Sequence, residues 1–454
     1  MAESPQGPGR KDPIIMKMFF VGFLVVLLLL PIEWIRGIIG ERQARQIDVK
    51  RELAATWGGR QVLSGPLLTL PYVEQWKTKD GETKTRTCFA YFLPEALEVN
   101  GTVEPEVRHR GIFEVILYRV TLHVRGSFAR PDFTLWRIPD EVVSWDDAAL
   151  SVGIPDLRGV AKEPAVRWDE RPLQFQPGVG EVDLYASGMH AAVRDLRDAV
   201  LKTHEFAFDL TLAGSEELSF VPSGKKTAVT LTSGWDAPSF SGAFLPSERT
   251  VDANGFRALW KVSYFGRPYP QQWRRADGFA GSLPQQTAAS AFGLRLLDPV
   301  DFYRMSDRSV KYATLFVVLT FLGFALFEIL NRLRIHPVQY LLVGLALCLF
   351  YLILLSLSEQ IGFALAYAIG TAATLGLVGG YTSKVLGSGR RAGAMVGLLG
   401  GLYGYLYVLL QLEDYALLLG TTGLFLILAS VMYLTRNLDW YAADLETERN
   451  RDAR

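Results

Sequence analysis

The sequence has 454 residues, in which 47 lysines and arginines are balanced by 47 aspartates and glutamates. This balance excludes the overall basic charge of a nucleic-acid-binding protein, so we expect no nucleic-acid partner. Hydrophobic residues make up 49% of the chain, and its mean hydropathy of +0.16 is high for a soluble protein. The only two cysteines, Cys88 and Cys348, cannot build a disulfide framework or a Cys/His metal cluster.

The first long uncharged run covers residues 18–32 and follows a basic stretch, an arrangement typical of a signal peptide. No small-x-small cleavage site follows it, and apolar character continues to Ile39. An uncleaved signal anchor is therefore favoured over a cleaved signal peptide. We predict a cytoplasmic tail over residues 1–13 and a first transmembrane helix over residues 14–39.

Residues 36–57 mix charged and apolar residues and end at Gly58-Gly59, which is a helix stop signal. This pattern predicts that the first span continues as a charged helical stalk.

Residues 40–309 are interpreted as a separate β-rich domain. Apolar and polar residues alternate in the segments 111–128, 205–233 and 255–266, with glycine, proline and serine at the turns. Alternation with period two predicts antiparallel strands that bury one face. We expect a mainly-β, sandwich-like domain of one or two lobes, in which only residues 186–202 suggest a helix or an irregular segment.

Five further uncharged runs lie in the last third of the chain. The last four are 21 to 24 residues long, and a helix of about 20 residues spans a hydrocarbon core of ~30 Å. The first run is shorter, but it extends past Glu328, so we also interpret it as a span. The runs predict a five-helix transmembrane bundle over residues 310–435 and a cytoplasmic tail over residues 436–454. They cover residues 312–327, 337–358, 360–383, 392–412 and 415–435.

Charged residues in the short loops predict the orientation of these six spans. The loops "NRLRIH" and "SKVLGSGRRA" contain arginine and lysine but no acid, whereas "SLSEQIG" and "QLEDY" contain acids but no lysine or arginine. By the positive-inside rule, the basic loops and both termini are cytoplasmic and residues 40–309 are exported. We therefore expect a multi-pass membrane protein with a large exported domain. That domain contains one cysteine, Cys88, and a lack of disulfides suits a bacterial periplasm better than a eukaryotic extracellular setting.

Small residues recur at four-residue spacing in the last spans. Such rows let helices approach closely, and we expect them to mediate packing. A pore lined by glycine backbone is the alternative. The rows are Gly362-Ala366-Gly370, Gly376-Gly380, Gly393-Gly397-Gly401 and Gly400-Gly404.

Few residues offer recognisable chemistry. The sequence has no HExxH motif, no G-x-S-x-G elbow and no Walker lysine, and its five histidines are scattered. We therefore expect no catalytic residue, no metal site and no cofactor, and we interpret Cys88 as an inert core cysteine. Ionisable residues near membrane depth are functional candidates by default, which leaves Glu328, His336 and Glu359. Each lies near the end of a span, so a structural role at the membrane interface is the competing interpretation.

Several long strings resemble the CreD family of inner-membrane proteins of Gram-negative bacteria. The strings "RIHPVQYLLVGL", "LTSGWDAPSFSGAFLP", "SDRSVKYA", "YALLLGT" and "LTRNLDWY" are similar to signatures of that family and occur in its order. The resemblance covers roughly residues 16–441. It implies an inner-membrane location, a role in cell envelope integrity, and links to a two-component stress regulon and to colicin tolerance. It implies no established reaction, ligand or catalytic residue.

Three functions are compatible with these features. The first is a non-enzymatic envelope protein whose periplasmic domain binds an envelope protein, a lipid or a cell-wall component, while the bundle anchors it in the lipid bilayer. The second is a transporter or channel formed by the C-terminal bundle. The third is a membrane enzyme acting on lipid or glycan, with His336 or Glu328 as its candidate residues. The oligomeric state is left open by the sequence.

Overall fold

The structure is a computed structural model whose described residues form two compact units, one within residues 1–46 and 300–454 and one within residues 47–299. The sequence pattern predicts this division at residues 40 and 309. The predicted tails over residues 1–13 and 436–454 lie almost wholly outside the described residues. The description covers residues 13–77, 80, 82–194, 196, 203–277, 280–296, 302–330, 335–385, 388–412 and 415–436.

The first unit is helical. Five of its described helices are long and apolar enough to cross a membrane, or six if the bent pair α3–α4 counts as one span. The predicted count of six spans therefore depends on that pair. The helices of this unit are α1 (Pro13–Trp57), α3 (Phe302–Lys311), α4 (Ala313–Leu330), α5 (Pro337–Ile361), α6 (Phe363–Val385), α7 (Gly389–Gln411) and α8 (Ala416–Thr435).

Helix α1 runs without a break for 45 residues, through Pro31 and the polar segment that follows. This confirms the prediction that the first span continues as a charged helical stalk. The helix ends at Trp57 and is followed by Gly58, whose φ of +145° favours glycine.

The predicted span over residues 312–327 is a more complex element in the structure. Helix α3 is amphipathic and meets α4 at a bend of 45°. Its charged residues are Arg304, Asp307, Arg308 and Lys311. A search for long uncharged runs therefore does not detect this helix.

The glycine rows pack less than the sequence predicts. A Cβ atom added at most of them would meet nothing within 4 Å, so the expectation of close helix packing is wrong there. Close approach occurs instead at Gly344, where a Cβ would lie 2.2 Å from Leu28 Cδ1 of α1, and at Gly379 and Gly423. Four-residue spacing does not show which face of a helix meets a neighbour. The rows facing open space are Gly376-Gly380, Gly393-Gly397-Gly401, Gly362 and Gly404.

The second unit is built from two β-sheets and a short helix α2 (Leu283–Ala289). One sheet has nine strands, in the order β13-β17-β11-β1-β5-β9-β8 with β2 beside β1 and β16 beside β2. Its strands are β1 (Gln61–Lys77), β2 (Thr83–Phe92), β5 (Ala148–Gly153), β8 (Gln176–Pro177), β9 (Gly188–Val193), β11 (Glu217–Phe220), β13 (Pro238–Gly242), β16 (Gln272–Arg274) and β17 (Phe292–Leu296).

The other sheet has eight strands in the order β14-β15-β12-β3-β4-β10-β6-β7. All described pairs in both sheets are antiparallel except β1–β11 and β3–β12. Its strands are β3 (Ala96–Arg110), β4 (Phe113–Ala129), β6 (Ala165–Trp168), β7 (Arg171–Gln174), β10 (Thr203–Ser215), β12 (Lys226–Ser233), β14 (Glu248–Asp252) and β15 (Gly255–Ser263).

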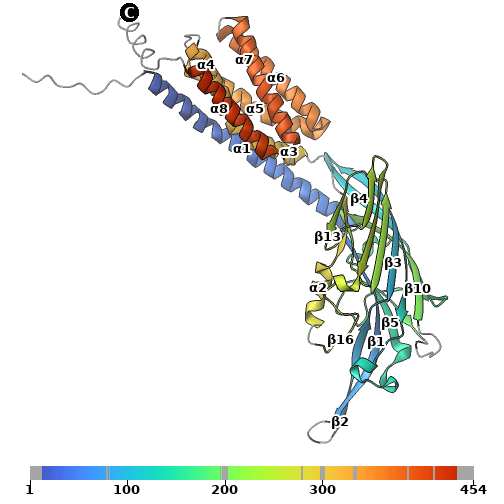
Figure 1. Cartoon of the computed structure of the whole chain (residues 1–454). Helices are drawn as coiled ribbons and strands as arrows, with labels where there is room; N and C mark the ends of the chain where they lie inside the picture. Colours follow the sequence, from blue (N-terminus) through green and yellow to red (C-terminus); the bar gives the residue numbers. More distant parts are fainter. Residues whose placement is uncertain are drawn as a thin grey trace, which may run out of the picture. The chain divides into compact units, whose positions relative to one another are not determined.

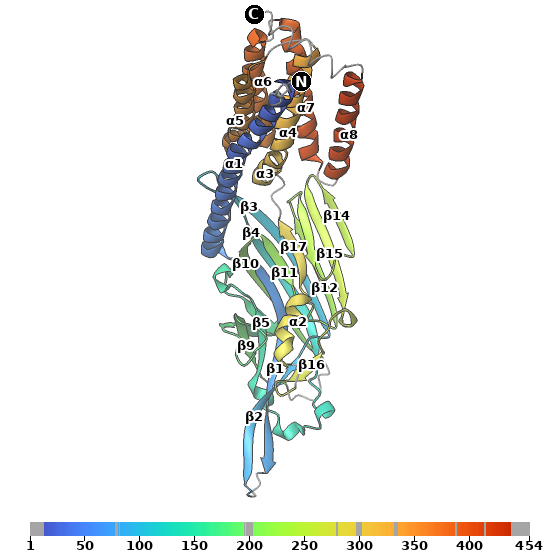
Figure 2. The same ribbon diagram turned by 90° about the vertical axis from the view of Figure 1, so that its left-hand side faces the viewer.

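One apolar core lies between the two sheets. It combines inward residues of the first sheet, such as Leu68 and Leu150, with inward residues of the second, such as Val99, Val120 and Leu231. Strands such as β4 and β10 contribute mostly alternate residues, as the period-two pattern predicts. The arrangement confirms the expected sandwich-like β domain, and Figure 2 shows the strands of both sheets.

Residues 186–202 do not form the suggested helix in their described part. Residues Gly188–Val193 are the strand β9, which pairs with β5. Their side chains alternate between buried and exposed positions with period two. In a stretch this short, a period-two pattern is hard to distinguish from a helical pattern in the sequence. Most of the remainder of the segment lies outside the described residues.

The strands β1 and β2 form a hairpin that extends beyond the core. Their pairing continues to Lys77 and Thr83, although the side chains at this end are mostly exposed. The hairpin projects from the rest of the β domain in Figures 1 and 2.

Candidate functional site

Glu328 fastens the connection between α4 and α5. One carboxylate oxygen accepts a hydrogen bond from the backbone N–H of Ile335 at 3.1 Å, and the other accepts one from the Tyr340 hydroxyl at 3.0 Å. Tyr340 is buried against Phe321 and Phe324 of α4. The carboxylate therefore joins the end of one helix to the first turns of the next.

His336 is the N-cap of α5. Its Nδ1 accepts the N–H of Val338 at 3.3 Å, and its own backbone N–H donates to Gln339 Oε1 at 3.0 Å. The two bonds form a capping box, with Pro337 at the first helical position. His336 therefore has a helix-boundary role in the structure. It lies close to Glu328, whose carboxylate bonds to the neighbouring residues Ile335 and Tyr340.

Glu359 lies at the other end of α5. Its side chain is only 10% exposed. The Tyr303 hydroxyl of α3 donates to Glu359 Oε1 at 2.8 Å, and Arg42 Nε of α1 lies 4.0 Å from the same oxygen. Glu359 therefore links three helices, and Tyr303 and Arg42 are polar partners that sequence reasoning did not identify.

The three candidates do not form a single site. His336 and Glu359 are 23 positions apart on the same helix, which corresponds to about 35 Å along its axis. Glu328 and His336 share one end of α5, and Glu359 occupies the opposite end. Among the described residues, no group of three or more His, Cys, Asp or Glu side chains is placed to hold a metal ion.

Two histidines of the β domain pair with carboxylates on the neighbouring strand. His123 Nδ1 lies 2.6 Å from Asp209 Oδ1, and His109 Nε2 lies 3.1 Å from Glu114 Oε1. Both pairs are direct cross-strand neighbours, so their contact follows from the register of the second sheet. These pairs join neighbouring strands, and both are exposed to solvent.

His204 is the most buried histidine described. It is 2% exposed, its Nδ1 lies 2.6 Å from Asp169 Oδ2, and its ring stacks on Trp168 at 5.6 Å. Asp169 also accepts the N–H of Glu205 at 2.8 Å. Asp169, in the β6–β7 turn, therefore holds this turn against β10 by contacting the His204 imidazole and the Glu205 N–H.

Cys88 lies in β2 and is buried, as the sequence interpretation expects. Its Sγ lies 3.5 Å from Glu74 Oε2 on the paired strand β1. Arg86 also contacts this carboxylate and is the largest cause that lowers the pKa of Glu74.

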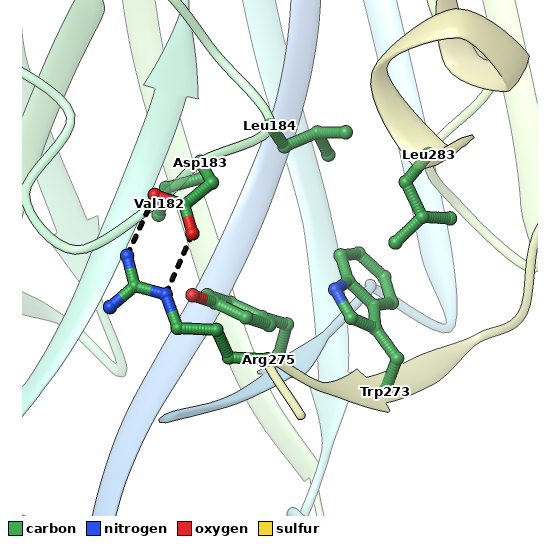
Figure 3. A pocket seen from close by; sticks show the side chains of 7 residues that line it. Val182, Asp183, Leu184, Trp273, Arg275 and Leu283 are labelled. Carbon is green, nitrogen blue, oxygen red and sulfur yellow. Dashed lines mark hydrogen bonds and ion pairs between the residues drawn. The ribbon is translucent and has the colours of Figure 1, made fainter. Parts of the chain in front are cut away.

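A small pocket of about 30 Å³ opens in the β domain beside Trp273 and Tyr91 (Figure 3). Arg275 closes one side through two hydrogen bonds of 2.7 Å to Asp183 and a contact of 3.1 Å to Glu181. The guanidinium lowers the pKa of Asp183, and burial raises the pKa of Tyr91 to about 12. The volume suffices for about one water molecule, so we interpret the pocket as a packing feature.

The exposed end of the β1–β2 hairpin carries a different group of side chains. Trp76 is 44% exposed, and the guanidinium of Arg86 lies 5.8 Å from its ring centroid. Glu74 pairs with Arg86 from the same face. Sequence reasoning did not identify this hairpin. The Asp-Gly dipeptide at positions 80–81, between two alternating stretches, is the sequence signal that could have indicated it, although not how far the strands extend.

The comparisons with known proteins agree on one family. The model of the family "Inner membrane protein CreD" matches residues 13–441. The protein named "Inner membrane protein CreD" from Escherichia coli (strain K12) is 36% identical over 441 residues, which covers 96% of this chain and 95% of that protein.

Two solved structures that align with this chain are too dissimilar to inform its fold or function. An M1 zinc metallopeptidase of Deinococcus radiodurans aligns with a TM-score of 0.19 and 12% identity over 37% of this chain and 39% of its own. A second structure of an M1 zinc metallopeptidase from the same organism gives a TM-score of 0.19 and 13% identity, over 37% of this chain and 38% of its own. Scores this low indicate neither a shared fold nor a shared function.

Proposed function

Because this chain belongs to the CreD family of inner membrane proteins, we propose that it supports cell envelope integrity under stress without catalysing a reaction. The β domain extends into the periplasm and binds an envelope protein, a lipid or a cell-wall component. The helical unit, with both termini in the cytoplasm, anchors that domain in the membrane.

The observation that carries this proposal is the exposed β1–β2 hairpin. A tryptophan and an arginine stack at a strand end that contributes little to the core. Aromatic and arginine side chains are enriched in the centres of protein interfaces. The ladder of strand pairs from Leu68–Phe92 to Lys77–Thr83 holds these side chains in a defined position before any partner binds, which reduces the entropy lost on binding.

A non-catalytic role is supported by the hydrogen bonds that the three candidate side chains of the bundle make. Glu328, His336 and Glu359 each bond to neighbours that close a helix end or join helices. Catalytic acids and bases instead need a path to a substrate. An anchoring role for the bundle is supported by its aromatic packing, in which Phe350 contacts Tyr351, Tyr367 and Tyr403 at centroid distances of 4.7 to 5.4 Å.

The proposal is tested by complementation of a strain that lacks the gene. The full-length protein and its Trp76→Ala and Arg86→Ala variants are expressed at matched levels, and survival under detergent or cell-wall stress is measured. We expect both variants to lose most of the protection, because removal of a central interface aromatic commonly costs about 2 kcal/mol or more of binding free energy. Leu245→Ala is the matched control, because Leu245 is also an exposed apolar side chain, at 69%.

The same strain distinguishes the other two functions. Glu328→Ala and Glu359→Ala proteins that accumulate normally should protect the cells, because the proposed function uses neither carboxylate for chemistry. If they fail while the Trp76 and Arg86 variants succeed, the bundle carries a transport or enzymatic activity and the proposal is wrong.

A further inference from the structure

An apolar groove runs between α4, α7 and α8 of the helical unit. Its volume is about 240 Å³, and all its lining side chains except Tyr312, Tyr405 and Thr421 are apolar. A hydrocarbon-lined cavity of about 150 Å³ can already hold a benzene ring. The groove therefore has room for a longer stretch of hydrocarbon.

Two of the three polar side chains of the lining, Tyr405 and Thr421, are already hydrogen-bonded within the protein. Tyr405 donates its hydroxyl hydrogen bond to the carbonyl of Leu419, and Thr421 donates to the carbonyls of Leu417 and Leu418 at 2.9 and 3.0 Å. The groove consequently presents hydrocarbon to its occupant at these two positions. A polar solute would gain few hydrogen bonds by entering it.

The groove exists because α8 touches the bundle at few points. Gly423 is the only described residue of α8 that is buried, and a Cβ atom there would lie 2.3 Å from the Tyr405 hydroxyl oxygen. On the side toward α4, no side chain fills the space beside Gly420, where an added Cβ would meet nothing within 4 Å. Figure 2 shows α8 beside α7 and apart from the other helices of its unit.

Charged side chains of α3 lie at one end of this groove. Arg308 of α3 donates from Nη2 to the carbonyl of Leu409, a lining residue, at 3.3 Å. Lys311 directly precedes the lining residue Tyr312, is 59% exposed, and pairs with Asp307 at 2.7 Å. The groove is lined by the halves of α4, α7 and α8 nearest to α3. If these helices span the membrane, the groove and α3 belong to the same leaflet.

We propose that this groove binds one acyl chain of a membrane phospholipid, with the phosphate group of the same lipid at Arg308. The chain matches the apolar lining and volume, and the phosphate matches a guanidinium placed at membrane-interface depth. The inference rests on the membrane location of the helical unit and is independent of the partner proposed for the β domain.

The test uses the full-length protein, purified in detergent, stripped of lipid and examined by native mass spectrometry. Dioleoylphosphatidylglycerol, dioleoylphosphatidylethanolamine or dioleoylglycerol is then added. We expect one tightly bound molecule of either phospholipid and weaker binding of dioleoylglycerol, which has the same chains but no phosphate. A clear preference for phosphatidylglycerol would show that net lipid charge adds to the phosphate contact.

Two variants locate the site. Gly420→Phe adds a bulky side chain at a groove residue where a Cβ atom would meet nothing within 4 Å. It should weaken phospholipid binding about tenfold or more, equivalent to at least about 1.4 kcal/mol. Gly22→Phe is the control, because Gly22 is an exposed glycine of α1 where an added Cβ also meets nothing within 4 Å. Arg308→Gln keeps a donor for Leu409 and should weaken the phospholipids but not dioleoylglycerol.

Size-exclusion chromatography and thermal unfolding establish that each variant is folded. If the wild-type and Gly420→Phe proteins retain equal amounts of lipid, the bound molecules are ordinary bilayer lipid outside the groove, and the proposal is wrong. A polypeptide chain crosslinked across the groove in place of lipid would overturn it as well. Equal weakening of dioleoylglycerol by Arg308→Gln would remove the phosphate contact from the proposal.

Discussion

Single polar side chains close the helix ends of the membrane unit. His336 and Gln339 exchange hydrogen bonds at the start of α5, while Glu328 reaches the same corner from α4. Unbonded N–H groups at a helix start cost free energy, and the cost is greater where water is scarce. The candidate residues of the sequence are therefore placed where backbone groups need partners.

The cap predicts a specific result for His336. His336→Ala removes the acceptor for the Val338 N–H and should lower the free energy of unfolding by about 1 kcal/mol. His336→Ser restores an N-cap oxygen and should recover most of that loss. Thermal unfolding of the purified proteins measures both changes. If the serine variant is stable but fails to complement the deletion strain, the imidazole has a function beyond capping.

At the scale of elements, the bent pair α3–α4 determines how the chain enters the bundle. Helix α4 has 18 residues, which corresponds to about 27 Å and is just sufficient for the hydrocarbon core. Helix α3 buries Tyr303, Ser306 and Ser309 and exposes charged residues on its other side. These lengths and charges favour α3 as an interfacial helix that leads into a spanning α4.

This interpretation predicts different thiol accessibility along the pair. Arg304→Cys on the exposed side of α3 should react in intact cells with a membrane-impermeant maleimide once the outer membrane is permeabilised. Val318→Cys should not react, because a side chain that is 40% exposed in the protein would face hydrocarbon if α4 spans the membrane. The protein's own cysteines are buried and should give little background. Strong labelling of Val318→Cys would place α4 outside the hydrocarbon core.

For the whole molecule, orientation in the membrane decides which compartment the β domain meets. The basic loops between spans and the acidic loops at the other ends predict a periplasmic β domain and cytoplasmic termini. Alkaline phosphatase fused after Gly111 or Gln360 should therefore be active, because the enzyme folds only after export. Fusions after Arg334 or Gly389 should be inactive, and activity at Arg334 would reverse the assigned orientation.

Much of this protein is determined by the sequence alone. Long uncharged runs specify spanning helices because unpaired backbone groups are excluded from hydrocarbon, and period-two alternation specifies strands because a sheet buries one face. Both patterns are local, so α5–α8, β4, β10 and β15 follow from them. Family membership follows from the strings around His336 and Trp235 in the same way.

Other features depend on the tertiary structure, because they arise from contacts between distant segments. The sequence shows Glu359 near a span end, but only packing brings Tyr303 and Arg42 to it from two other helices. Four-residue spacing marks the glycine rows, but only the arrangement of helices decides that Gly344 meets Leu28 while Gly397 meets nothing. The groove beside Gly420 likewise exists only because α8 contacts α7 at one close point, which no local pattern encodes.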